Sequence, residues 1–329
     1  MKRILSLLIT LACVVGFIYG CAAVSSSSSP SQSAPSEASL PEEKAPTLLL
    51  CLPRDGEDHT LLRDTFTASA QALGYEACIS EPATDSALTD EQVWDVDQLQ
   101  HQANAAIIYN CDGVEEGLVK KWSDAGIAVV AAGKRLDGQM AVENTVLSRR
   151  IKANVAYADG ALSKAICAHV IDTLTAKRTS AGFIALFGDT DAQLEFLNFV
   201  KADITLAESQ YTPNAPTPTA DAAADLEAVK AAKAILYAGT DTAAWTAAIP
   251  SVKTSALMGL CAATPDAFAA LQNQTVDFIA FNDPIDLMHK AVEAAHTLLS
   301  TEQALTEWSS TAATLVLTPD DPRLASYIQ

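Results

Sequence analysis

The sequence predicts an α/β protein built from two Rossmann-like lobes, each with a parallel sheet, and a ligand cleft between them. From Thr47 onward, short runs of apolar residues alternate with longer segments in which apolar residues recur at helical spacing. Continuous apolar strands between amphipathic helices are typical of a parallel sheet covered by helices on both faces. The alternation stops across residues 135–152 and then starts again, which indicates a second lobe of similar size.

Each element of the first lobe follows from this alternation. The helices that precede Gly74 and Gly126 are expected to end there, because glycine readily takes the left-handed conformation at a helix end. The expected strands cover residues 48–52, 75–79, 105–109 and 127–132, and the expected helices cover 58–73, 91–102 and 114–124.

The second lobe repeats the same alternation, interrupted by a proline-rich loop at residues 213–218. The expected strands cover residues 183–187, 204–211, 234–237, 256–260 and 278–280, and the expected helices cover 155–176, 192–202, 220–232, 242–249 and 265–272.

The N-terminus carries an export signal. Lys2 and Arg3 precede an uncharged run, residues 4–19, that is too short to be a typical spanning helix. Ile18-Tyr19-Gly20-Cys21 has the layout of a lipobox, so residues 1–20 are predicted to be a signal peptide and Cys21 the lipid-bearing first residue of the mature chain. Two acyl chains hold a protein at a membrane stably. An uncleaved anchor and cleavage at another position are the alternatives.

After Cys21 the chain is rich in Ser and Pro as far as residue 45 and lacks apolar periodicity. This composition predicts a flexible tether with a mean reach on the order of 25 Å. The charge of the chain is strongly acidic, with 21 basic and 40 acidic residues. Removing residues 1–20 takes away two basic residues, so the net charge changes from −19 to −21. Such a chain is repelled by nucleic acid, which excludes nucleic-acid binding.

The cysteines and histidines indicate neither a metal site nor an enzyme. Five cysteines follow Cys21 and form no CxxC pair, which predicts buried free thiols and no cofactor. The five histidines lie singly, and the chain has no GxSxG, P-loop or HExxH motif. We therefore predict that the protein is not an enzyme. The five cysteines are Cys51, Cys78, Cys111, Cys167 and Cys261.

Three segments resemble a known family. They are the strand 48–53 with the helix end 68–76, the Asp-Ala-Gly-Ile-Ala-Val-Val stretch at 124–130, and a tail with Thr-Pro-Asp-Ala at 264–267, Phe-Asn-Asp-Pro at 281–284 and Lys-Ala-Val-Glu-Ala-Ala at 290–295. In this order and spacing they resemble type I periplasmic binding proteins of the ribose- and galactose-binding kind, over nearly all of residues 46–329.

The resemblance implies that the chain crosses between the lobes three times. It places residues 46–142 and 283–305 in the N-terminal lobe and residues 143–282 and 306–329 in the C-terminal lobe. It also implies a ligand between the lobes, hinge closure around it, and docking of the bound complex on a membrane permease.

The sequence departs from the family at most of the positions that hold sugar. Only the amide at Asn282 keeps its chemistry, so the resemblance does not imply ribose-like specificity. The family's Asp-Arg after the fourth strand falls on Gly133-Lys134, its Asp-Asn before the long helix on Val155-Ala156, its Arg near Glu195, its Asn-Asp on Thr240-Asp241 and its later Asp on Cys261.

The carboxyl ends of parallel strands line the cleft in open α/β sheets, so the residues there are the candidate ligand contacts. Such charged residues are often only solvated surface, but the fold gathers these loops in one place. The candidates are Arg54, Asp55, His59, Asn110, Asp112, Lys134 and Arg135 in the first lobe, and Asp189, Asp191, Thr240, Asp241, Cys261 and Asn282 in the second.

The candidates include a basic group, Arg54, Lys134 and Arg135, in a chain with few basic residues. This group could meet a carboxylate or phosphate of the ligand, while the three aspartates of the second lobe meet an amine or hydroxyls. An amphoteric or polyhydroxylated ligand would fit. Alternatively, these charges pair with one another across the closed cleft.

Together these observations predict a monomeric, extracytoplasmic solute-binding protein that is lipid-anchored to the cell membrane. The resemblance implies that it delivers a small polar solute, sugar-like or related, to the permease of an ABC importer. One alternative is a ligand sensor for a membrane receptor kinase. Another is a degenerate member of the fold that binds nothing.

Overall fold

The computed structural model describes residues 45–52, 59–80, 103–109, 116–133, 151–300 and 308–328. The chain divides into two units, Met1–Lys44 and Ala45–Gln329, and the described residues all belong to the second. The predicted signal peptide, Cys21 and most of the tether therefore lie outside the described residues. No helix within the described ranges is long and apolar enough to cross a membrane.

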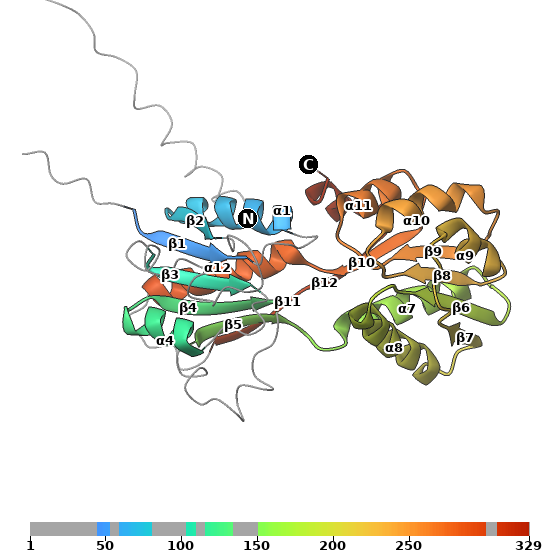
Figure 1. Ribbon diagram of the computed structural model, residues 1–329, viewed down its shortest axis with the longest axis horizontal. Helices are drawn as coiled ribbons and strands as arrows, with labels where there is room; N and C mark the ends of the chain where they lie inside the picture. The colour runs from blue at the N-terminus through green and yellow to red at the C-terminus, as the bar shows by residue number, and fades with distance from the viewer. Residues whose placement is uncertain are drawn as a thin grey trace, which may run out of the picture. The chain divides into compact units, whose positions relative to one another are not determined.

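The first sheet has six strands in the order β11-β5-β4-β3-β1-β2, and every neighbouring pair is parallel (Figure 1). Strands β1 and β3 are buried along their whole length, as their unbroken apolar sequences predict. The strands are β1 (Thr47–Cys51), β2 (Glu76–Ser80), β3 (Ala105–Tyr109), β4 (Ala128–Gly133), β5 (Ile151–Tyr157) and β11 (Trp308–Ala312).

Helices cover both faces of this sheet. Helices α1 (His59–Ala72) and α12 (Pro284–Ser300) share one apolar cluster with the sheet, in which Phe66 is fully buried. Helix α4 (Glu116–Asp124) contributes Trp122 to a second cluster with the same strands. Each fully buried side chain of this size stabilises the fold by roughly 1.5–3 kcal/mol, so these helices are fixed mainly by packing.

The second sheet also has six strands, in the order β12-β10-β9-β8-β6-β7. Its strands pair in parallel, except that β12 runs antiparallel to β10. The strands are β6 (Gly182–Phe187), β7 (Tyr211–Asn214), β8 (Ala234–Tyr237), β9 (Leu257–Leu260), β10 (Phe278–Asn282) and β12 (Thr314–Leu317).

Two groups of helices cover the second sheet, each around its own apolar cluster. Helices α7 and α8 pack into one cluster, and α9, α10 and α11 pack into the other. This arrangement confirms the predicted α/β class with two parallel-sheet lobes. The helices are α7 (Ala161–Ala176), α8 (Asp191–Leu206), α9 (Ala222–Ala228), α10 (Thr242–Ala248) and α11 (Pro265–Gln272), followed near the C-terminus by the short 3-10 helix Pro322–Ser326.

The chain passes from one sheet to the other three times, between β5 and α7, between β10 and α12, and between β11 and β12. Strand β5 pairs with β4, and β11 pairs with β5, so both strands belong to the first sheet. The lobe boundaries predicted at 142/143 and 305/306 are therefore wrong. The crossings after β5 and β11 lie instead at residues 158–160 and at Ala313.

Two predicted elements are wrong for local reasons. The helix predicted for residues 155–176 begins only at Ala161, because residues 155–157 complete β5. The strand predicted for 204–211 is not formed. Ile204 is instead buried on α8 with Leu197 and Val200, at helical spacing, and β7 starts at Tyr211. By contrast, the strands at 105–109 and 234–237 and the helix at 265–272 have their predicted bounds.

Candidate functional site

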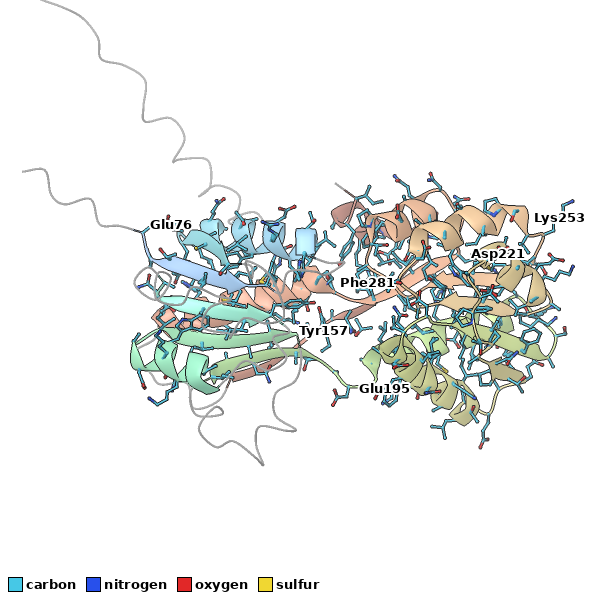
Figure 2. The ribbon with its side chains drawn as sticks, viewed as in Figure 1. Glu76, Tyr157, Glu195, Asp221, Lys253 and Phe281 are labelled. Atoms are coloured by element: carbon cyan, nitrogen blue, oxygen red, sulfur yellow. The ribbon has the colours of Figure 1, made fainter. Side chains whose placement is uncertain are left out.

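A pocket of about 350 Å³ lies at the carboxyl ends of β4, β5 and β10, where an open parallel sheet binds its ligands. Figure 2 labels Tyr157, the last residue of β5, and Glu195 on α8, which both line it. The first turn of α7 and the first three turns of α8 complete the wall. The lining residues are Gly133, Tyr157, Ala158, Asp159, Gly160, Leu162, Ser163, Ala192, Glu195, Phe196, Phe199 and Asn282.

Asn282 connects this pocket to the crossings between the sheets. It ends β10, and its Oδ1 accepts a hydrogen bond from Oγ1 of Thr314 at 3.1 Å. Since Oδ1 faces Thr314, the amide group that remains for a solute is a donor. Asn282 is the only predicted candidate among the described residues that line the pocket.

The two crossings nearest Asn282 are tied together by hydrogen bonds. The N–H of Asp283 donates to the carbonyl oxygen of Ala313 at 2.9 Å. In return, the N–H of Ala313 donates to Oδ2 of Asp286 at 2.7 Å. Nζ of Lys290 donates to the same carboxylate and to the carbonyl oxygen of Thr311, both at 2.8 Å. This network fixes the start of α12 against the link between β11 and β12.

The remaining crossing, between β5 and α7, contributes Asp159 and Gly160 to the pocket. These two residues were missed in the sequence analysis. Gly160 caps α7 in the left-handed conformation at φ 66°, which favours glycine. The resemblance placed the family's Asp-Asn pair on Val155 and Ala156, which are instead buried in β5. An Asp-Gly pair directly before an apolar helical segment was the available signal.

Helix α8 supplies one wall of the pocket through Ala192, Glu195, Phe196 and Phe199, whose spacing places them on one helix face. Thr190 fixes the start of this helix, because its side chain and that of Gln193 form a capping box. Phe199 is 56% exposed although it is aromatic. The resemblance placed the family's Arg near Glu195, whereas Phe196 and Phe199 at helical spacing from it were readable in the sequence and were missed.

Asp189, by contrast, is engaged with its own lobe. Its carboxylate accepts hydrogen bonds from the N–H and Oγ1 of Thr240, the shortest at 3.0 Å, and from the hydroxyl of Tyr237 at 3.3 Å. Tyr237 is buried and stacked on Trp245 at a ring distance of 4.3 Å. Burial, above all, raises the pKa of the Tyr237 hydroxyl. The hydrogen bonds between Asp189 and Thr240 thus join the loop after β6 to the loop after β8.

The other candidates of the second lobe also have local roles. Asp191 lies in the first turn of α8, and Asp241 caps α10 by accepting from the N–H of Ala244 at 3.0 Å. Both acidic side chains suit the positive end of a helix. Cys261 packs against the apolar cluster of α7 and α8, and burial raises the pKa of its thiol to about 12. Among the described residues, neither aspartate nor Cys261 lines the pocket.

Of the first-lobe candidates, only His59 is described. It begins α1, and its Nε2 is buried without a hydrogen-bond partner among the described residues. The predicted basic group stays a prediction. The candidates outside the described residues are Arg54, Asp55, Asn110, Asp112, Lys134 and Arg135.

A second pocket, of about 730 Å³, is lined by α1, α11, the start of α12 and the C-terminal residues 326–328. Its wall includes Phe268 and Tyr327, whose rings stack at 5.2 Å. The pKa of Tyr327 is raised by burial and by its hydrogen bond to Asp283. No predicted candidate lines this pocket.

The thiols and acidic groups give no sign of a metal centre. Within the described ranges, no three His, Cys, Asp or Glu side chains gather as metal ligands would. Cys78, Cys167 and Cys261 are free thiols, although Cys78 and Cys261 are only partly buried.

The fold matches solved structures, whereas no protein-family profile and no curated protein matches the sequence. The arabinose-binding protein AraP from Geobacillus stearothermophilus superposes with a TM-score of 0.64 at 11% identity, covering 87% of this chain and 100% of that one. A galactofuranose-binding protein superposes with a TM-score of 0.60 at 14% sequence identity, and the match covers 86% of this chain and 97% of that one. An ABC transporter solute-binding protein from Bacillus halodurans C-125 with bound myo-inositol has a TM-score of 0.57 at 16% sequence identity, and the match covers 87% of this chain and 98% of that one.

This chain has the type I periplasmic binding protein fold. The two matches cover 87% of this chain and 98–100% of the solved structures, so the fold that the resemblance implied is confirmed. The 350 Å³ pocket of this chain lies at the carboxyl ends of strands from both sheets. At 11–16% identity, the likeness extends to the fold and not to the ligand.

Proposed function

We propose that the protein is a lipid-anchored, extracytoplasmic solute-binding protein that delivers a small polar solute to an ABC importer. The pocket at the carboxyl ends of β4, β5 and β10 carries this proposal. Its wall combines residues from the first sheet, from the crossing at 158–160 and from α8 on the second sheet. Its volume lies within the range of small-molecule sites. The protein acts by binding, and it performs no chemistry on the solute.

A solute in this pocket would favour one arrangement of the two sheets, because its contacts come from both. A ligand shifts such an equilibrium only by its difference in affinity for the two states. Asn282 is suited to sense the solute, since it contacts both the pocket and Thr314 on β12. The two crossings that the hydrogen bond between Asp283 and Ala313 joins would then serve as the hinge about which the two sheets move.

Thermal unfolding of the full-length chain against sugars, polyols, amines and amino-acid-like solutes tests solute binding. A solute that binds only the folded chain stabilises it by about 2.7 kcal/mol at a hundred times its Kd. We expect Asn282→Ala to reduce the stabilisation, and Asn273→Ala, a change outside the pocket, to leave it unchanged. If no solute in a broad panel stabilises the chain, the proposal is wrong.

Anchoring and delivery need a separate experiment in cells. Replacing Cys21 by Ser removes the proposed acylation site, so we expect the protein to move from the membrane fraction to the soluble fraction. Solute uptake should fall on deletion of the gene and be restored by the wild-type chain. Unchanged uptake together with a lost transcriptional response to the solute would indicate a sensor in place of an importer subunit.

A further inference from the structure

The wall of the 350 Å³ pocket has an unusual chemical composition. Three aromatic side chains, Tyr157, Phe196 and Phe199, line it together with two carboxylates, Asp159 and Glu195. None of the described residues that line it is a Lys, Arg or His. The aromatic and acidic groups thus share one small cavity.

These groups come from separate parts of the chain and are held independently. The capping box at Thr190 sets the rotation of α8, which places Glu195, Phe196 and Phe199 on one face. Asp159 is held by the crossing before α7, next to the left-handed Gly160. Phe199 remains largely exposed, although a surface ring of that size gains more from a partner than from water.

Aromatic faces and carboxylates attract the same kind of ligand. The negative face of an aromatic ring binds an ammonium group, and several rings around a site are the usual means of holding a quaternary amine. A carboxylate adds direct charge attraction, which is strengthened where walls exclude water. The net charge of −19 on the chain also raises the local concentration of cations.

We propose that the solute of this pocket is an organic cation that carries a protonated or quaternary amine. This inference rests on the proposed solute-binding function and narrows its substrate class. Asp159 and Glu195 face the charge, and the rings of Tyr157, Phe196 and Phe199 surround it. The free amide donor of Asn282 takes a hydroxyl or carbonyl oxygen elsewhere on the solute.

The predicted basic group would favour the opposite charge. Lys134 and Arg135 directly follow Gly133, which lines the pocket, and they lie outside the described residues. The experiment therefore compares a cation, a neutral molecule and an anion built on the same scaffold.

Isothermal titration calorimetry of the full-length chain provides the test. One pair of probes is choline and the neutral alcohol in which a carbon atom replaces its nitrogen. The other set is glucosamine, glucose and glucuronate. We expect the amine in at least one set to bind about tenfold or more tightly than its neutral partner, the size of effect that cation–π and charge contacts give.

Two variants assign the effect to the pocket. Glu195→Gln removes one charge and Phe199→Leu removes one ring, and each should weaken amine binding about tenfold and weaken the binding of neutral probes to a smaller extent. Both residues are exposed, so the folded state should be retained, which an unchanged urea unfolding curve checks. Glu293→Gln and Leu194→Ala are matched controls, because both residues are exposed and lie outside the pocket.

The outcomes separate this inference from the function on which it rests. If neutral probes bind as tightly as the amines, or if glucuronate binds most tightly, the cation proposal is wrong and the solute-binding function stands. If amines bind preferentially but neither variant weakens them, the assignment to this pocket is overturned. If neither these probes nor a broad panel binds, both proposals fail.

Discussion

At the scale of single residues, position at a strand end does not decide whether a polar group faces a ligand. Asp189 lies two residues after β6 and Asn282 is the last residue of β10, and both were predicted to contact the solute. Asn282 lines the pocket, whereas Asp189 is occupied by Thr240 and Tyr237. The difference depends on hydrogen-bond partners some 50 residues away, which no local sequence pattern specifies.

This difference predicts that Asp189 contributes to stability. Asp189→Ala leaves the buried hydroxyl of Tyr237 without its acceptor, so we expect the free energy of unfolding to fall by about 1–3 kcal/mol. Asp191→Ala, two residues further on, removes only an exposed acid of the first helical turn and should cost no more than about 1 kcal/mol. Urea unfolding measures both. Equal losses would show that the bonds to Asp189 carry no stability of their own.

At the scale of elements, sequence periodicity predicted the buried strands and failed where two periodicities overlap. The run at Ala234–Tyr237 is apolar throughout and only four residues long, and this short length favours a buried strand over a helix. Residues 155–157 continue directly toward α7, so their apolar side chains also fit a helix. Pairing with β4 and β11 decides for the strand, and that pairing is a contact between distant parts of the chain.

The same limit applies to the candidate site. The sequence indicated which edge of each sheet carries the cleft, because that follows from topology. The resemblance placed the family's Arg near Glu195, but the sequence did not identify Phe196 and Phe199, because their common face with Glu195 depends on where α8 begins. A shift of that start by one residue would rotate the face by about 100°.

One close approach between neighbouring strands gives an element-scale prediction. A Cβ on Gly259 in β9 would collide with the ring of Phe278 in β10, which is fully buried. Gly259→Ala should therefore cost about 1–3 kcal/mol through overpacking. A Cβ on Gly182 would meet the flexible side chain of Lys233 in place of a buried ring, so Gly182→Ala should cost less, about 1 kcal/mol at most.

Urea unfolding of the two glycine variants provides the comparison. Equal stability of both would show that the β9–β10 contact adapts without cost. A selective loss in Gly259→Ala would support the tight packing of the strand that positions Asn282, because β10 carries both Phe278 and Asn282.

At the scale of the whole molecule, two buried tyrosines each hold a carboxylate at a junction of the fold. Tyr237 donates to Asp189 between the loops after β6 and β8. Tyr327 bonds to Asp283, whose carboxylate also accepts from the N–H groups of Ile285 and Asp286 at the start of α12. Both junctions therefore require a neutral phenol.

These tyrosines make stability dependent on alkaline pH. Burial raises the pKa of both hydroxyls above the value of about 10 that tyrosine has in an unfolded chain. Since the unfolded state then loses its protons first, their contribution is complete below about pH 10 and decreases as the pH rises toward the folded-state pKa values. The free energy of unfolding should therefore fall steeply above about pH 10.

Urea unfolding of the wild type and of Tyr237→Phe from neutral to alkaline pH isolates one of these groups. The variant should be less stable at neutral pH by about 1 kcal/mol, because it loses the bonds of the hydroxyl to Asp189 and to the N–H of Asp241. Its stability should then decrease less steeply above pH 10, since one raised pKa is gone. The buried thiols titrate equally in both proteins, so the difference between the two curves belongs to Tyr237. Parallel curves would show that the Tyr237 hydroxyl does not contribute to the loss of stability above pH 10.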